Sequence, residues 1–202
     1  MDPSKELGYL RVGSVEDKDL TSEIKRHSCE LTVDTKTVSR KLQLTNGNKT
    51  VTYVGGHNLH HFHRRGFHSP QLLCINGLTD RHYWEVECSG DVYIAVSYSG
   101  ISRKGITGNN EFGSNSQSWA LVVKTGSPSV IARHDNTETP IVSHNRFTRV
   151  AVYVDYAAGI LSFFSVSSDT LIHLHTFKTR FTDPLYPGFA VFPGSKVLLQ
   201  KR

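Results

Sequence analysis

The feature that most limits the fold of this chain is a succession of short apolar segments, none of which keeps the period of a helix. From residue 28 to residue 202, these segments are separated by turn residues, and no stretch of about a dozen residues repeats apolar positions every third or fourth residue. In residues 149–155, for example, Val150, Val152 and Val154 fall on one face of a strand. Many short strands with frequent turns predict an all-β domain, either a sandwich or a barrel.

A pair of turn residues marks the first predicted hairpin. Asn46 and Gly47 follow the apolar positions of residues 42–44 and precede residues 51–54, which have the composition of a second strand. Both residues of the pair tolerate a positive φ, which tight hairpin turns require. The sequence therefore predicts two antiparallel strands joined at this point.

The first residues differ in character from the rest of the chain. Residues 1–20 are polar and mixed, without strand alternation, and residues 17–25 are expected to form a short helix. We therefore predict a leader or linker over residues 1–27 and a single domain over residues 28–202. The start lacks the apolar stretch of a secretory signal, and no apolar run approaches the roughly 20 residues that cross a bilayer. These features predict a cytoplasmic protein without a membrane span.

The chain carries a positive charge that is unevenly distributed. Lys and Arg number 23 and Asp and Glu 18, which gives a net charge of +5. Residues 1–27 hold five basic and six acidic side chains, leaving 18 against 12 in the remainder, a surplus that favours acidic partners or nucleic acid. The basic residues are mostly scattered, with short pairs at Arg64-Arg65 and Arg103-Lys104. A solvated surface is the default interpretation, and nucleic-acid binding is an alternative.

Three cysteines, Cys29, Cys74 and Cys88, lie within apolar or alternating runs. A disulfide framework favours an even number of cysteines, and a zinc site favours paired spacings such as C-x-x-C. The sequence has neither pattern. We therefore predict buried, reduced thiols.

Histidines form the most conspicuous local cluster. The cluster consists of His57, His60, His61, His63 and His68. No Cys or carboxylate lies nearby, and a loop offers no rigid frame for metal geometry, so a polar loop with a pH-dependent charge is the default interpretation. His173 and His175 alternate on a predicted strand, where they would share one face as surface histidines. We therefore expect no required metal and no cofactor.

The aromatic and polar residues predict structure rather than catalysis. Trp84 and Trp119 lie between apolar neighbours in predicted strands, where large aromatic side chains are core anchors. The same role is predicted for Phe163, Phe164, Phe189 and Phe192. No G-x-S-x-G nucleophile motif, Gly-Lys-Ser/Thr phosphate loop or spacing of paired carboxylates occurs. We therefore expect that the chain is not an enzyme.

Several short motifs follow one another along the chain. They are Cys29–Asp34, Arg40–Leu44, Ser69–Cys74, Gly77–Thr79, His82–Glu87, Ile94–Tyr98, Ser102–Gly105, Phe112–Asn115, Gln117–Trp119, Val154–Gly159, Leu161–Val166 and Pro184–Phe189. In this order they resemble the PRY-SPRY domain found at the C-terminus of many tripartite-motif ubiquitin ligases, with related copies in fish innate-immune receptors and stonefish-type toxins. Thr35 stands where the family usually has proline, a difference confined to a turn.

The resemblance implies a fold and a function. It implies an antiparallel β-sandwich of two bent sheets, a concanavalin-like jelly roll, with the PRY part over about residues 28–80 and the SPRY part over about residues 81–202. It also implies a protein-interaction module, the substrate- or ligand-recognition end of a ubiquitin ligase or an innate-immune protein. Any ligase activity would then lie in domains absent from this chain.

The resemblance further implies a binding face of loops and strand ends. Carried over by position, the face includes Tyr98, Ser99, Arg103, Val122, Lys124 and Tyr186, with His61, Phe62, Phe112 and His134 at its rim. Alternatively, Tyr186 packs against the edge of the sandwich and Lys124 is merely solvated. Nucleic-acid binding and glycan binding remain open as functions at this point.

Overall fold

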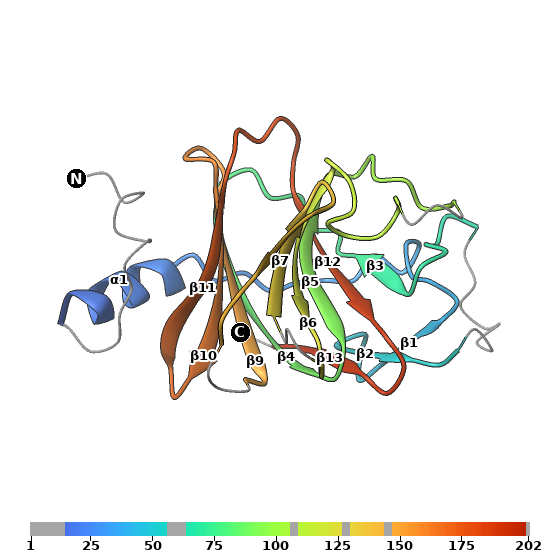
Figure 1. Ribbon diagram of the computed structural model, residues 1–202, viewed down its shortest axis with the longest axis horizontal. Helices are drawn as coiled ribbons and strands as arrows, with labels where there is room; N and C mark the ends of the chain where they lie inside the picture. The colour runs from blue at the N-terminus through green and yellow to red at the C-terminus, as the bar shows by residue number, and fades with distance from the viewer. Residues whose placement is uncertain (1–14, 56–63, 106–108, 127–129, 144–146, 201–202) are drawn as a thin grey trace.

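Two antiparallel sheets packed face to face, with one short helix outside them, form the computed structural model (Figure 1). The structure describes residues 15–55, 64–105, 109–126, 130–143 and 147–200. The predicted β-sandwich is confirmed.

The larger sheet has seven strands in the order β1-β2-β13-β4-β9-β10-β11. Its strands are β1 (Leu42–Thr45), β2 (Thr50–Tyr53), β13 (Lys196–Leu199), β4 (Arg81–Ser89), β9 (Arg149–Asp155), β10 (Ile160–Ser167) and β11 (Thr170–Lys178). β1 and β2 form the predicted hairpin, and Asn46 and Gly47 adopt φ values of 53° and 62° in the turn between them. The hairpin prediction is therefore confirmed.

The smaller sheet has six strands in the order β3-β12-β5-β6-β7-β8. Its strands are β3 (Gln71–Leu73), β12 (Tyr186–Val191), β5 (Val92–Ser97), β6 (Ser118–Val123), β7 (Val130–His134) and β8 (Thr137–Pro140). Every residue of β8 is exposed. The sequence analysis did not predict β8, because an exposed strand has no apolar alternation to reveal it.

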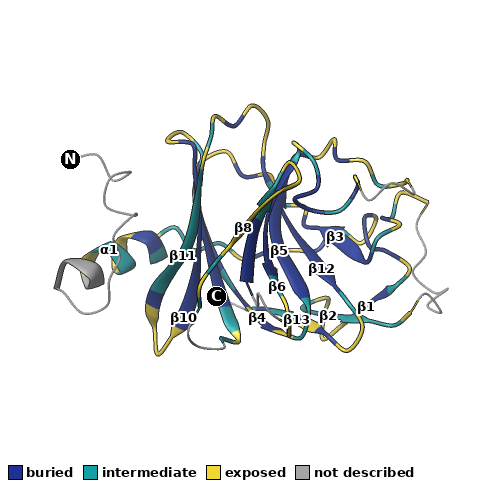
Figure 2. Ribbon diagram, in the orientation of Figure 1, coloured by how far each residue is buried: buried dark blue, intermediate teal, exposed yellow. Residues whose placement is uncertain are grey.

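The core lies between the two sheets. Trp84 and Trp119 are each only 3% exposed and belong to this core, as predicted, together with the fully buried Phe163 and Phe189. Figure 2 shows the central strands of both sheets buried and most connecting loops exposed. Phe192 differs from its prediction because it is half-buried and packs outside the core, on the outer face of the smaller sheet.

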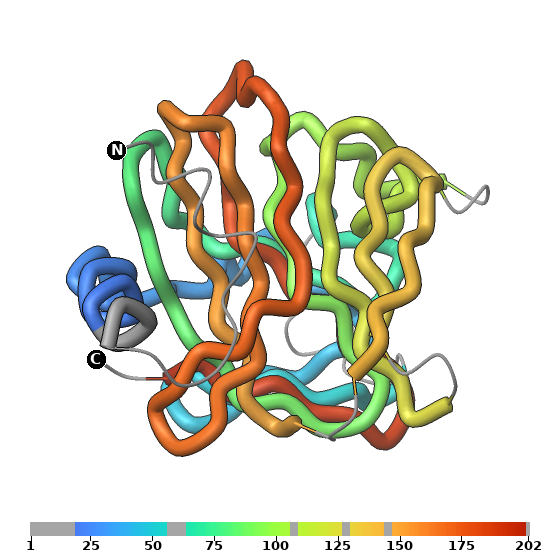
Figure 3. The backbone as a smooth tube through the Cα atoms, turned by 60° about the vertical axis from the view of Figure 1, so that its left-hand side comes forward, coloured from blue at the N-terminus to red at the C-terminus, as the bar shows by residue number. Residues whose placement is uncertain are grey.

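The helix α1 (Val15–Lys25) covers part of the outer face of the larger sheet. Ile24 is 2% exposed and packs in a cluster that includes Tyr83 and Phe164. Figure 3 shows α1, in blue, outside the sheet. The predicted short helix is confirmed, and its apolar side chain docks on the sandwich. The division into a leader over residues 1–27 and a domain over residues 28–202 remains a prediction.

The cysteines carry free thiols, as predicted. Cys74 and Cys88 are buried, and burial raises the pKa of the Cys88 thiol to about 11. Cys29 is only half-buried, so the prediction of burial is wrong for this residue. Its segment runs beside β4, where its backbone N–H donates a hydrogen bond to the carbonyl of Tyr83.

The two histidines of β11 do not share a face, which corrects the prediction. Phe163 lies opposite His175 and Phe164 lies opposite His173, so Leu174 is an extra residue that forms a β-bulge. The bulge shifts the alternation by one residue. His173 therefore contacts Phe164 on the outer face of the sheet, whereas His175 lies on the inner face.

The buried histidines predict a stability that falls in mild acid. Desolvation lowers the pKa of His173 and of His175 below the ordinary value of 6.5, and the like charge of His173 lowers that of His175 further. Below about pH 6.5, the unfolded chain therefore binds more protons than the folded chain. The stability that the two neutral histidines contribute is fully present above that pH and is lost as the pH falls. We expect the melting temperature to drop by about 3 °C between about pH 7.5 and 5.5.

The matched test replaces both histidines. Thermal unfolding of the double variant His173→Gln/His175→Gln should show a smaller decrease over the same pH range. An identical decrease in the double variant would mean that other groups cause the acid sensitivity. His82, whose pKa desolvation also lowers, is the next residue to replace in that case.

Candidate functional site

An aromatic cluster surrounds Trp119 near one end of the smaller sheet. The ring of His134 stacks on Trp119 with a centroid distance of 4.5 Å and an interplanar angle of 8°. Tyr98 and Phe181 meet the same indole edge to face, at 5.2 Å and 5.4 Å. Such rings are rigid and combine a large apolar surface with polar edges, a combination that suits protein recognition.

Backbone contacts fix the positions of these rings. Trp119 and His134 lie directly opposite each other on β6 and β7. The Nδ1 atom of His134 lies 2.8 Å from the carbonyl oxygen of Ser118, which can only accept, so Nδ1 carries the donated proton. The backbone N–H of Thr182 donates to the hydroxyl of Tyr98 at 3.1 Å. The loop that follows β11 is thereby attached to the end of β5.

The aromatic contacts continue into the larger sheet. His134 lies 6.2 Å from Phe177 of β11, and Phe177 lies 4.5 Å from His175. We call the joint surface the aromatic face and define it as Tyr98, Trp119, His134, Tyr156, His175, Phe177 and Phe181. Its members His134, Tyr156, His175 and Phe177 are half-buried, so their rings are partly accessible to a partner.

The structure brings together only some of the residues that the resemblance implied. Tyr98, which is 8% exposed, and His134 both contact Trp119. Ser99 follows Tyr98 and is exposed beside the aromatic face. His61 and Phe62 lie outside the described residues. Of the implied residues, Tyr98 and His134 therefore belong to the aromatic face, and Ser99 follows it in the chain.

Three other implied residues lie on the outer face of the smaller sheet instead. Val122 is 2% exposed, and Tyr186 packs half-buried on the same cluster. Phe112 is fully buried, which makes its predicted position at an accessible rim wrong. Its ring covers Gly188 so closely that a Cβ atom at Gly188 would lie 2.6 Å from it. Strand alternation explains the separation, since Val122 and Trp119 point to opposite faces of β6.

Lys124 lies far from Tyr98 along the strand direction. Ser97 pairs with Ser118 at one end of the β5–β6 ladder, and Lys124 comes just after the other end. Five residues from Trp119 to Lys124 correspond to about 17 Å of strand. Lys124 is exposed there, in agreement with a solvated side chain.

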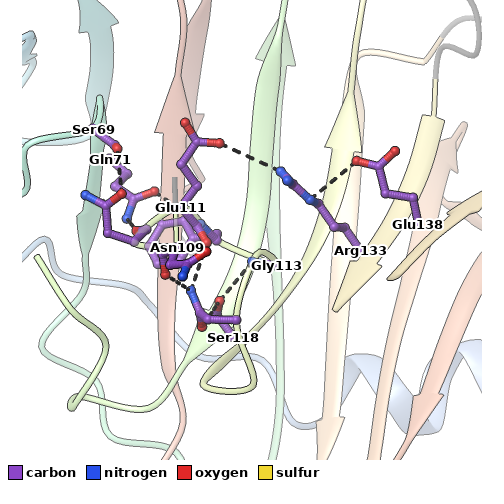
Figure 4. A network of polar contacts seen from close by, with 11 residues as sticks. Ser69, Gln71, Asn109, Glu111, Gly113, Ser118, Arg133 and Glu138 are labelled. Carbon is purple, nitrogen blue, oxygen red and sulfur yellow. Dashed lines mark hydrogen bonds and ion pairs between the residues drawn. The ribbon is translucent and has the colours of Figure 1, made fainter. Parts of the chain in front are cut away.

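A polar network holds the loop that buries Phe112 (Figure 4). The buried side chain of Gln71 donates to the carbonyl of Asn110 at 2.5 Å and accepts from the N–H of Phe112. Arg133 of β7 forms ion pairs with Glu111 of the loop and with Glu138. This loop is therefore attached to the sheet through Asn110, Glu111 and Phe112.

Several members of the aromatic face were missed by the sequence analysis. Tyr156, Phe177 and Phe181 come from turns and from an edge strand. Phe181 contacts Trp119, Phe177 contacts His134, and Tyr156 contacts Phe181, because the two sheets pack together. A hydrophobic pattern along one segment cannot report contacts between sheets. The only sign of these residues in the sequence was that they are aromatic and lie in or near turns.

A cavity of about 190 Å³ lies between the segment after α1 and β4, lined partly by Cys29, Trp84 and Glu85. The indole N–H of Trp84 has no hydrogen-bond partner there. Glu85 accepts hydrogen bonds from the hydroxyl of Tyr83 and from the guanidinium of Arg149, so its charge is already compensated. In the described part of the chain, no group of three or more His, Cys, Asp or Glu side chains is arranged to hold a metal ion.

Comparison with known proteins decides the family. Residues 81–200 match the family model described as the SPRY domain. The chain belongs to the SPRY family. It is 37% identical over 169 residues to the beta subunit of neoverrucotoxin from Synanceia verrucosa, covering 84% of this chain and 24% of the toxin subunit. It is 34% identical over 171 residues to tripartite motif-containing protein 16 from Mus musculus, covering 83% of this chain and 30% of that protein.

Solved structures give the same result. The stonustoxin structure matches with a TM-score of 0.80 and 36% identity, over 88% of this chain and 28% of that chain. The PSpry domain of TRIM65 matches with a TM-score of 0.83 over 95% of this chain and all of that domain, at 24% identity, and so supports the fold. The resemblance to PRY-SPRY domains is thereby confirmed.

The family has two consequences for this chain. SPRY domains are protein-interaction modules and not catalysts, which agrees with the expectation that the chain is not an enzyme. The chain spans about a quarter of the length of the curated toxin relatives that it matches. In the described residues, no helix is both long and apolar enough to cross a bilayer.

Proposed function

We propose that this SPRY domain recognises a target protein through the aromatic face and the exposed loop residues beside it. The observation that carries the proposal is the stack of His134 on Trp119, extended by Phe177 from the other sheet. Strands and cross-sheet packing hold these rings in place before binding, so little conformational freedom would be lost in a complex. Aromatic residues on a rigid frame are typical of the residues that supply most binding energy in protein interfaces.

The wider role follows from the relatives. We propose that the domain forms the substrate- or ligand-recognition part of a cytoplasmic TRIM-like ubiquitin ligase or innate-immune protein. The match to tripartite motif-containing protein 16 supports this proposal. Any ligase chemistry would lie in other segments of such a protein.

A protein partner suits the aromatic face better than nucleic acid. Aromatic rings make up this face, and exposed basic side chains next to them in the chain are Lys178 and Arg180, whereas nucleic-acid binding depends mainly on phosphate neutralisation by many such side chains. Binding through this face should therefore change little between low and moderate salt.

Replacing Ser99 with arginine is expected to weaken partner binding by about tenfold or more, because a long charged side chain would cover the neighbouring rings. The matched variant is Lys124→Glu, at the other end of the β5–β6 ladder, which should change binding by less than about twofold. Both positions are exposed, so both variants should fold normally. Affinity capture from a lysate, followed by titration of the purified captured protein, measures both effects.

Three results would contradict the proposal. Weaker binding with Lys124→Glu but not with Ser99→Arg would move the interface away from the aromatic face. Equal weakening in both variants would indicate a diffuse electrostatic surface. Loss of capture after nuclease treatment would show that nucleic acid, rather than a protein contact, mediates the interaction.

A further inference from the structure

The fold brings together basic residues that are scattered along the sequence. Three pairs, Arg40-Lys41, Arg64-Arg65 and Arg103-Lys104, lie in segments far apart in the chain. A cavity of about 410 Å³ is lined by Arg40, Lys41, Arg64, His68 and Lys104, with Ser39, Gly66 and Phe67 between them. Each of the three pairs thus contributes at least one lining residue. We call this cavity the basic pocket.

Backbone hydrogen bonds fix the three segments relative to one another. The N–H of Phe67 donates to the carbonyl of Thr37 at 3.0 Å, which attaches the second segment to the first. The N–H of His68 donates to the carbonyl of Arg103 at 2.8 Å, which attaches it to the third. The N–H of Val54 donates to the carbonyl of Lys41 at 2.7 Å. The walls of the basic pocket are therefore held in place by the fold.

Phe67 forms the apolar base of this arrangement. It is 3% exposed and packs edge to face on Phe112, with a centroid distance of 5.9 Å. The guanidinium of Arg103 lies 5.7 Å from the centroid of the Phe67 ring and donates a hydrogen bond to the carbonyl of Arg65. The charge of Arg103 is thus held beside Phe67, one of the lining residues, and adds to the positive potential.

Negative side chains are missing from the surrounding sequence. The chain has no Asp or Glu between Asp34 and Asp80, and none between Asp91 and Glu111. All three basic pairs fall inside these two intervals. Among the lining residues that the structure describes, none carries a carboxylate. The like charges of Lys41, Arg64 and Lys104 line one pocket, and an anion there would relieve their mutual repulsion.

The shape of the basic pocket indicates a compact ligand. Its volume falls within the usual range of small-molecule sites, roughly 300–1,000 Å³. Guanidinium groups bind phosphate oxygens in pairs, and lysines add point charges. An extended nucleic acid would need a basic stripe with accessible rings for base stacking, but Phe67, the aromatic lining residue, is buried. A phosphorylated small molecule fits these features better.

We infer that the basic pocket binds a compact anion carrying two or more phosphate groups, either free in solution or as the headgroup of a phosphoinositide lipid. The pocket is separate from the aromatic face. Its segments adjoin β1 and β3, which lie on the right in Figure 1, whereas β11 lies toward the left. The two sites share no residue, so binding of such an anion does not require the aromatic face to bind a protein.

The test titrates the full chain with inositol hexakisphosphate by calorimetry and by thermal shift. We expect one molecule to bind per chain, with a rise in melting temperature, because a ligand of the folded state stabilises it. The double variant Arg64→Glu/Lys104→Glu should bind about tenfold more weakly or worse. The control, Arg26→Glu/Lys196→Glu, makes the same change in net charge at exposed positions away from the pocket and should keep nearly the original affinity.

A vesicle arm separates the two sources of the ligand. Chain that sediments with vesicles containing phosphatidylinositol bisphosphate, but not with phosphatidylserine vesicles of equal charge, would identify a lipid headgroup. Binding of inositol hexakisphosphate without vesicle binding would identify a soluble ligand. Both results support the inference, provided that the pocket variant loses binding.

Other outcomes would overturn the inference. Absence of binding to both probes at low salt would refute an anion site. An equal loss of affinity in the pocket variant and in the control would mean that overall charge, rather than the pocket, attracts anions. Binding of a single-stranded RNA oligonucleotide more tightly than inositol hexakisphosphate, with affinity that rises with its length, would assign the basic residues to nucleic acid instead.

Discussion

Replacing Gly159 with alanine is expected to destabilise the domain by about 3 kcal/mol, or about 10 °C in melting temperature. Gly159 lies in the turn from β9 to β10 with a φ of 69°. A Cβ atom there would lie only 1.9 Å from the carbonyl oxygen of Thr179. The N–H of Thr179 also donates to the carbonyl of Gly159, at 2.9 Å, so the two backbones are tied together. The clash cannot be relieved without breaking that contact.

Gly47 provides the matched control for this variant. It has a similar φ of 62°, but a Cβ atom there would have no neighbour within 4 Å. Gly47→Ala therefore adds only the conformational cost of a left-handed alanine, about 1 kcal/mol. Chemical denaturation of both variants measures the difference. Equal losses in the two variants would show that φ, and not the contact with Thr179, determines the cost.

Replacing Trp119 with alanine is expected to cost about 3–5 kcal/mol of folding free energy and to abolish partner binding. The indole is 3% exposed and contacts Tyr98, His134 and Phe181. Its loss would leave a cavity near one end of the sandwich and remove the ring on which His134 stacks. The milder variant Trp119→Phe should keep the fold and weaken partner binding by about tenfold.

A matched variant at Trp84 distinguishes the effect of Trp119 on stability from its effect on partner binding. Trp84 is also 3% exposed and packs in the same core, but it is not part of the aromatic face. Trp84→Phe should therefore destabilise the domain to a similar degree as Trp119→Phe while leaving partner affinity unchanged. If the two phenylalanine variants lost affinity in parallel, the effect of Trp119 on binding would be an indirect result of lower stability.

The fold could be predicted because its signals are local. The apolar alternation of residues 149–155 and the turn at Asn46 and Gly47 appear in the structure as expected. The shared face of His173 and His175 was predicted wrongly, because the bulge at Leu174 depends on pairing with β10 and leaves no mark in a strand pattern. Departures from regular pairing are set by the neighbouring strand.

The candidate sites could be predicted only in part, because both are built from distant segments. The resemblance assigned Tyr98 to one binding face and His134 to its rim, but their common contact with Trp119 and the approach of Phe177 depend on sheet packing. The sequence analysis noted two of the basic pairs, Arg64-Arg65 and Arg103-Lys104, but gave no sign that they lie close together. Their convergence with Arg40 and Lys41 required the backbone contacts that connect the three segments.

The extra residue at Leu174 also limits the self-association of the sheets. β11 is the last strand of the larger sheet in the described part of the chain, and an edge strand is a template on which another chain can add. The bulge breaks the regular spacing of backbone donors and acceptors along β11, so an incoming strand could pair over only a short length. At the corresponding edge of the smaller sheet, β8 ends in Pro140, which has no N–H to donate. Both edges thereby resist growth into fibrils.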